Sequence, residues 1–151
     1  MRKKVVVDTG VYIELFNRNR YREVLDPFNR VTYLAYPVLH ELWMGLKGRE
    51  EIRALTRWRD RYVTLKRYIL PTVETLNRIG EVCLKLKTAG RLDPAMPKHY
   101  NDICIAALAR QVGAVVLTKN EKDFTLIQCA IDVEFENVDR IDTPIKEEPR
   151  R

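Results

Sequence analysis

Residues 101–124 read NDICIAALARQVGAVVLTKNEKDF, and this stretch decides the fold class. Apolar side chains fill nearly every position from 103 to 112, which predicts a helix buried between two layers. Gly113 ends that helix, and the continuous apolar run over residues 114–117 is typical of a buried parallel strand. The polar residues that follow at once are Thr118, Asn120 and Asp123. A buried helix, a buried strand and a polar turn in succession predict an α/β sheet with functional groups at a strand end.

The alternation of strands and helices continues toward the N-terminus and, more weakly, toward the C-terminus. Further strands are predicted over residues 4–7, 31–35, 68–70 and 132–135. Further helices are predicted over residues 9–18, 36–48, 49–62 and 72–89. We therefore expect a three-layer α/β sandwich with a central, mostly parallel sheet of about five strands flanked by helices. One domain is expected over residues 1–140, followed by a flexible tail over residues 141–151.

Composition excludes several classes of protein. With 151 residues, of which 46% are apolar, the chain is long enough to bury a core without disulfides. Its longest apolar run, residues 103–109, is far shorter than the ~18 residues of a membrane span. Charged residues flank the short apolar run near the N-terminus, unlike a signal peptide, so a cytoplasmic location without membrane contact is expected. Three cysteines without CxxC spacing and two isolated histidines argue against a zinc site.

Charge is distributed unevenly along the chain. The net charge is +6, but residues 1–120 carry 22 Lys and Arg against 12 Asp and Glu. A basic body of this kind suits a polyanionic partner, although a generic solvated surface explains it as well. The densest basic run, opposed by a single acid at position 60, is a candidate contact surface. Its members are Arg57, Arg59, Arg61, Lys66 and Arg67.

Four acids fall where the predicted topology gathers side chains. Asp8 ends the first strand, and Glu41 lies in the first turns of the helix after the second strand. Asp123 lies in the loop after the fourth strand. Strand carboxyl ends and the helix N-termini that follow them share one edge of a doubly wound sheet, where ligands bind. Asp102 stands at the start of the buried helix and follows another helix instead of a strand. It lies near the other three acids only if the chain runs back to the carboxyl ends of the strands before residue 102.

Each acid also has an ordinary structural interpretation, and the group is more informative than its members. Asp8 and Asp102 are suitable helix caps. Glu41 suits a helix surface, and Asp123 suits a turn. Four converging carboxylates would repel one another unless a cation neutralised them, and Mg²⁺ or Mn²⁺ prefers such oxygen ligands. Such a site hydrolyses phosphodiesters, and a basic surface would hold the nucleic-acid backbone.

Several segments resemble the motifs of the PIN-domain family, and most closely those of VapC-type toxins from toxin–antitoxin pairs. The resemblance spans roughly residues 4–136. Its most specific part is an apolar strand followed by Thr-Lys-Asn-x-x-Asp-Phe, at residues 114–124. The segments that carry it are residues 5–9, 37–46, 101–109, 113–120 and 122–124. One departure is Gly10, where the family often has a polar residue.

The resemblance implies a metal-dependent endoribonuclease with Mg²⁺ or Mn²⁺ as cofactor and RNA as substrate. In this family Asp8, Glu41 and Asp102 would bind the metal, and Asp123 would complete the acidic cluster. The supporting residues would be Thr9, which bonds within the site, and Thr118 and Asn120, which orient water or phosphate oxygens.

The resemblance also implies partners. A small antitoxin protein and a second copy of the chain are expected, with Trp43 or Trp58 in the core or at the subunit interface. The basic run at residues 57–67 would face RNA or the antitoxin.

The sequence bears on three alternative functions. A haloacid-dehalogenase-like phosphatase needs a second acid two residues after Asp8, where this chain has Gly10. A receiver domain needs an acidic pair near its start, and the pair is absent. A non-catalytic PIN module, acting as an RNA- or protein-binding scaffold, stays open, although the complete set of acids disfavours it.

Overall fold

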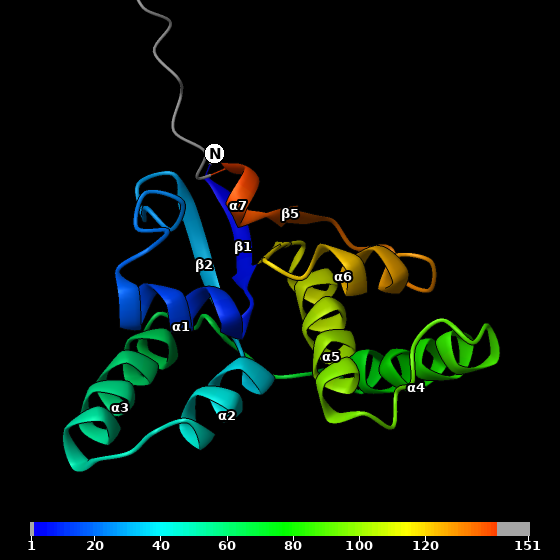
Figure 1. The fold of residues 1–151 in the computed structure, drawn as a ribbon, viewed down its shortest axis with the longest axis horizontal. Helices are drawn as coiled ribbons and strands as arrows, with labels where there is room; N and C mark the ends of the chain where they lie inside the picture. The colour runs from blue at the N-terminus through cyan, green and yellow to red at the C-terminus, as the bar shows by residue number, and fades with distance from the viewer. Residues whose placement is uncertain (1, 142–151) are drawn as a thin grey trace, which may run out of the picture.

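A five-stranded, all-parallel sheet forms the centre of the computed structural model, which describes residues 2–141 (Figure 1). The strand order is β3-β2-β1-β4-β5. Because the chain adds strands on one side of β1 and then on the other, the order reverses between β1 and β4. The expected three-layer fold is confirmed, with the sheet wholly parallel. The strands are β1 (Lys3–Val7), β2 (Arg30–Ala35), β3 (Tyr68–Ile69), β4 (Val115–Thr118) and β5 (Phe135–Asn137).

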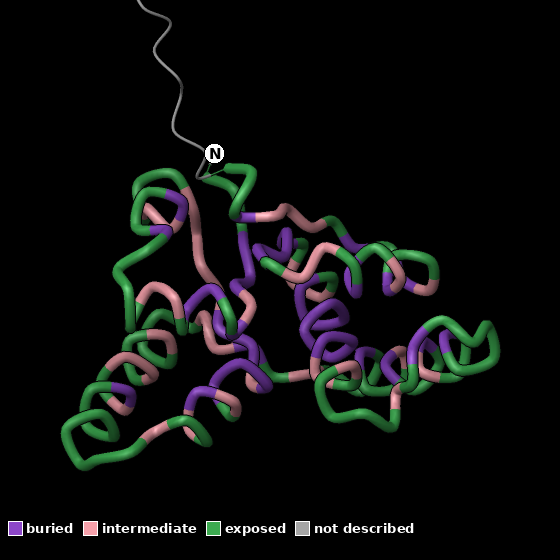
Figure 2. The backbone as a smooth tube through the Cα atoms, in the orientation of Figure 1, coloured by how far each residue is buried: buried purple, intermediate pink, exposed green. Residues whose placement is uncertain are grey.

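Helices surround this sheet, and the most buried of them is α5. Every residue from Asp102 to Ala109 in α5 is buried, as the apolar run predicts (Figure 2). Val5, Val6 and Val7 of β1 are at most 1% exposed, so both faces of this central strand are buried. Burial of each such side chain contributes about 1.5–3 kcal/mol. The helices are α1 (Thr9–Arg18), α2 (Tyr36–Met44), α3 (Arg49–Thr64), α4 (Val73–Thr88), α5 (Pro97–Val112), α6 (Glu121–Ile127) and α7 (Val138–Ile141).

Two helix boundaries differ from the prediction in ways that affect the acids. Helix α5 begins at Pro97, so Asp102 lies in its second turn and not at its N-terminus. Residues 98–101 lack the apolar periodicity that marks a helix, and proline at the first position is the only signal of its start. Asp123 lies in α6 and not in a loop, because the Asn120 side chain caps that helix by accepting from the Asp123 backbone N–H.

Smaller differences occur near the C-terminus. Strand β5 covers Phe135–Asn137 instead of residues 132–135, since these are the residues that pair with Val116–Thr118 of β4. The short helix α7 was not predicted. The expected tail lies, apart from Ile141, outside the described residues. Among residues 2–141, none of the helices combines the length and the apolar character needed to cross a bilayer.

Candidate active site

Asp8 occupies the point where the strand order reverses. It directly follows β1, and its backbone N–H donates to the Leu117 carbonyl of β4 over 2.9 Å. Its Oδ1 accepts from the Thr9 backbone N–H at 2.8 Å and so caps α1. Asp8 therefore caps α1 and also lies at the carboxyl ends of the strands, where ligands bind in such sheets.

Thr118, the last residue of β4, binds the other oxygen of Asp8. Its hydroxyl donates to Asp8 Oδ2 over 2.8 Å and accepts from the Asn120 backbone N–H at 2.9 Å. The Thr118 side chain is fully buried. It contacts the acid itself, and the role in orienting water or phosphate oxygens that the resemblance implied stays a prediction.

Asn120 links the two acids that the helices supply. Its Nδ2 donates to Asp123 Oδ2 over 2.8 Å and to Asp102 Oδ2 over 3.3 Å. Its Oδ1 accepts from the Asp123 backbone N–H at 3.3 Å. One amide therefore positions carboxylates from α5 and α6, and both of these acids are buried.

Glu41 approaches the cluster from α2. The Thr9 hydroxyl donates to Glu41 Oε1 over 3.2 Å. Since Thr9 follows Asp8 directly, Glu41 is connected to the other acids through the first residue of α1. The structure thus brings together all four acids and the three supporting residues at the carboxyl ends of the strands.

Burial and mutual repulsion favour protons on three of these carboxyls. Burial is the largest cause that raises the pKa of Asp8, Glu41 and Asp102. The pKa of Asp102 rises to about 8, because the Asp8 and Asp123 carboxylates add to the effect of burial. Such groups ionise when a cation replaces the proton.

The donor set fits a hydrated divalent ion better than a closed protein cage. Within residues 2–141, no group of three or more His, Cys, Asp and Glu side chains is arranged to hold an ion by itself. Mg²⁺ typically keeps several waters and takes one or two carboxylates plus substrate phosphates. Asp8 and Asp102 could supply such carboxylates, since Asp102 is buried, both are hydrogen-bonded and Asp8 lies within electrostatic reach of Asp102.

Lys98 and His99, on the first turn of α5, were missed by sequence reasoning. The charge of Lys98 lowers the pKa of Asp8, Glu41 and Asp102 against the effect of burial. His99 Nε2 lies 3.7 Å from Asp123 Oδ2. Both precede Asp102 by three or four residues, which places them on the same helix face. Recognition of Pro97 as the helix start would have revealed them.

The predicted basic run does not join the acids. It lies on α3 and the turn after it, and α2 lies between α3 and α5 (Figure 1). Within it, Arg59 pairs with Asp60 over 2.9 Å. Trp43 and Trp58 are partly buried and pack against the core. The contacts proposed for these residues stay predictions.

Comparison with known proteins places the fold among solved structures. A chain of VapBC-1 from nontypeable Haemophilus influenzae matches with a TM-score of 0.66 and 23% identity, covering 90% of this chain and 98% of that one. FitAcB from Neisseria gonorrhoeae gives a TM-score of 0.64 and 21% identity, covering 89% and 97%. VapBC-5 from Mycobacterium tuberculosis, described as a member of the VapBC family of toxin–antitoxin systems, gives 0.57 and 26%, covering 87% and 96%.

Sequence comparison identifies the family. No curated protein matches the chain significantly. The family model for the PIN domain matches residues 5–128, from β1 to just beyond α6. That range contains all four acids gathered at the strand ends, together with the threonines and the asparagine that hydrogen-bond to them. The chain therefore belongs to the PIN-domain family.

Proposed function

We propose that the chain is a Mg²⁺- or Mn²⁺-dependent endoribonuclease that hydrolyses RNA through Asp8, Glu41, Asp102 and Asp123. The observation that carries the proposal is the hydrogen-bonded network that joins these four acids at the switch point of a PIN fold. PIN domains are generally nucleases, and buried carboxylates with raised pKa values are the groups that a hydrated divalent ion requires.

In this mechanism the chain's own residues would hold the metal ion and orient the carboxylate oxygens that bind it. Asp8 and Asp102 would hold the ion as carboxylates, and because the pKa of Asp102 is raised, its carboxyl group would have to lose a proton to do so. Thr118 and Asn120 fix the carboxylate oxygens of Asp8, Asp102 and Asp123, so little reorganisation is needed when RNA enters. When bound, such an ion would supply a more acidic water and would offset the negative charge of the phosphate.

We extend the proposal to a toxin role with a small antitoxin partner. The support is the likeness to chains from VapBC complexes, one of them in a described toxin–antitoxin family at 26% identity. An antitoxin would neutralise the nuclease by covering it. The basic run on α3 is its proposed contact, with RNA as the competing occupant of the same surface.

A second copy of the chain is the proposed occupant of an apolar stripe along α4. Val73, Leu76 and Leu84 are 75%, 51% and 65% exposed and follow helical spacing. Gly80 lies between them, and nothing lies within 4 Å of a Cβ built there. A contiguous exposed apolar face of this kind favours association.

Substitution of Asp8 by asparagine tests the nuclease. Asn still caps α1 through its single side-chain oxygen, so Asp8→Asn removes the charge and keeps the cap. We expect cleavage of RNA in Mg²⁺ or Mn²⁺ to fall at least about 100-fold. The matched control is Asp132→Asn, at an exposed position on the opposite edge of the sheet.

Two outcomes would overturn the nuclease proposal. One is cleavage that Asp8→Asn leaves unchanged. The other is a wild-type protein that binds RNA without cleaving it in either metal, which would establish the scaffold alternative.

A further inference from the structure

A hollow of about 310 Å³ borders the carboxylate cluster on the side of α4 and α5. It lies where α4 ends and the chain turns back toward α5. Its lining residues are Lys87, Gly90, Arg91, Leu92, Asp93 and His99. Because His99 also faces Asp123, the hollow and the cluster share a wall.

His99 is fixed between the two sites by its ring nitrogens. Nδ1 lies 3.1 Å from the Asp93 backbone carbonyl, which only accepts, so Nδ1 carries the proton. Nε2 is thereby directed toward Asp123 Oδ2 at 3.7 Å. The neighbouring Lys98 acts electrostatically on the other three acids. A basic surface therefore continues from the cluster into the hollow.

The two cations of the hollow are not engaged in ion pairs with described residues. Among residues 2–141, neither Lys87 nor Arg91 forms an ion pair. The carboxylate of Asp93 also lines the hollow, but it accepts from the Ala95 backbone N–H at 3.0 Å and closes the turn. The hollow thus offers two cations, one of them a guanidinium that binds phosphate with two parallel hydrogen bonds.

A second hollow is lined by more acidic than basic side chains. It measures about 390 Å³ and lies at the start of β4, on the edge of the sheet away from the acids. It pairs one cation, Arg110, with two acids, Asp132 and Glu134. Position and charge together single out the hollow beside His99 as the one suited to a polyanion.

We propose that Lys87 and Arg91 bind the RNA phosphate next to the scissile one, with His99 forming the wall between the two sites. This inference rests on the proposed nuclease function and adds a backbone subsite to it. The scissile phosphate lies at the carboxylates and Lys98, and the strand continues past His99 into the hollow. Such a contact fixes register on RNA without reading sequence.

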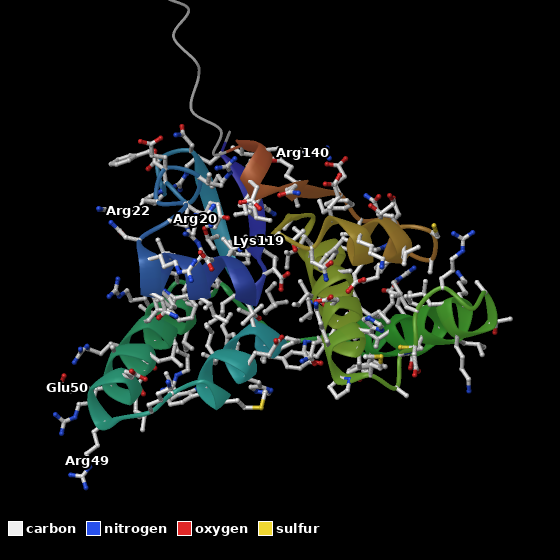
Figure 3. All side chains as sticks on the ribbon, in the orientation of Figure 1. Arg20, Arg22, Arg49, Glu50, Lys119 and Arg140 are labelled. Atoms are coloured by element: carbon white, nitrogen blue, oxygen red, sulfur yellow. The ribbon has the colours of Figure 1, made fainter. Side chains whose placement is uncertain are left out.

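The double variant Lys87→Ala/Arg91→Ala tests the subsite by equilibrium binding. The probe is a short fluorescent single-stranded RNA, titrated without divalent ions at several salt concentrations. Loss of two phosphate contacts reduces the slope of log K against log salt by about 1.4 and weakens binding at 0.1 M salt by roughly 25-fold. The matched control is Arg22→Ala/Arg49→Ala, which removes equal charge on the far side of the molecule (Figure 3).

The possible results of this experiment distinguish a failure of the phosphate subsite from a failure of the proposed nuclease function. Equal weakening by both double variants, or an unchanged slope in Lys87→Ala/Arg91→Ala, overturns the subsite while wild-type cleavage in Mn²⁺ still stands. A wild type that neither binds nor cleaves RNA overturns both proposals. Thermal unfolding of each variant checks that the end of α4 is intact, since Lys87 also lies at a helix C-terminus.

Discussion

Thr118 Oγ1 donates a hydrogen bond to Asp8 Oδ2 over 2.8 Å, and this contact follows from the register of two strands. In the β1–β4 ladder Val7 lies opposite Leu117, so the next residue on each strand meets at the strand ends. A slip of one residue would turn these side chains to the other face of the sheet. The buried valines that fix the register therefore also fix the candidate site.

Replacement of Thr118 by valine keeps the side-chain shape and removes the hydroxyl. Asp8 Oδ2 and the Asn120 N–H each lose a partner in a buried site. We expect stability to fall by about 1–3 kcal/mol and cleavage to fall about 10-fold or more. Urea unfolding and RNA cleavage measure the two effects. Thr56→Val, which removes an exposed hydroxyl bond to the Ile52 carbonyl in α3, is the control and should change neither.

Asp102 makes the metal-free protein less stable as pH rises. Its ordinary pKa is 3.8 and its folded pKa is about 8. Between these values the unfolded chain has lost the proton that the folded chain retains, so stability falls with rising pH and levels off above about 8. Asp102→Asn should flatten this slope in urea unfolding with a chelator present. If the stability of Asp102→Asn fell with pH as steeply as that of the wild type, the raised pKa would belong to a different residue.

Addition of Mg²⁺ should release a proton from the same group. At neutral pH most Asp102 side chains are protonated, so metal binding displaces about one proton per site. Titration calorimetry in buffers of different ionisation enthalpy measures this release. Asp102→Asn is expected to bind metal more weakly without the proton release, and proton release that persists in this variant would contradict the assignment.

The sequence predicted the sheet and the meeting of the acids because both depend on local pattern. Apolar β-branched runs identify buried strands, and strand ends share an edge by topology alone. Asp8 and Glu41 lie as expected for that reason. The β5 boundary was wrong because edge-strand pairing depends on its partner, and residues 135–137 carry no apolar run of their own.

The start of the helix that carries Asp102 and the whole helix that carries Asp123 were not predicted, because polar residues at these places show no apolar periodicity. Helix α6 is only seven residues long, and its stability depends on a cap and on tertiary packing. The first turn of α5 is exposed, so Lys98 and His99 showed no periodicity. Sequence pattern therefore located the acids but not the cations and the imidazole beside them.

Charge on the apolar stripe of α4 should dissociate the proposed dimer. Leu76→Arg places a cation at its centre, where a partner subunit would have to bury it without a counterion. Sedimentation velocity should show a dimer for the wild type and a monomer for Leu76→Arg. The control is Ile52→Arg, a similarly exposed position on α3. A wild type that sediments as a monomer at high concentration would contradict the proposal.

Asn120 offers the sharpest separation of a structural from a catalytic effect. Asn120→Asp keeps the shape and the capping oxygen of α6 but replaces the amide donor with a third carboxylate facing Asp102 and Asp123. Repulsion then raises the pKa of the cluster and displaces its oxygens, so we expect cleavage at neutral pH to fall about 10- to 100-fold.

Asn137→Asp is the matched control for this substitution. The Asn137 amide donates to Glu121 Oε2 over 3.1 Å, and its carbonyl oxygen accepts from the Asp139 N–H at 3.0 Å. Both variants therefore lose a donor-to-carboxylate contact and keep a capping oxygen, and both should lose similar stability in urea unfolding. Only Asn120→Asp should lose cleavage. Equal activity of the two variants would show that Asn120 serves the fold alone, because the same chemical change would then have the same effect away from the acids.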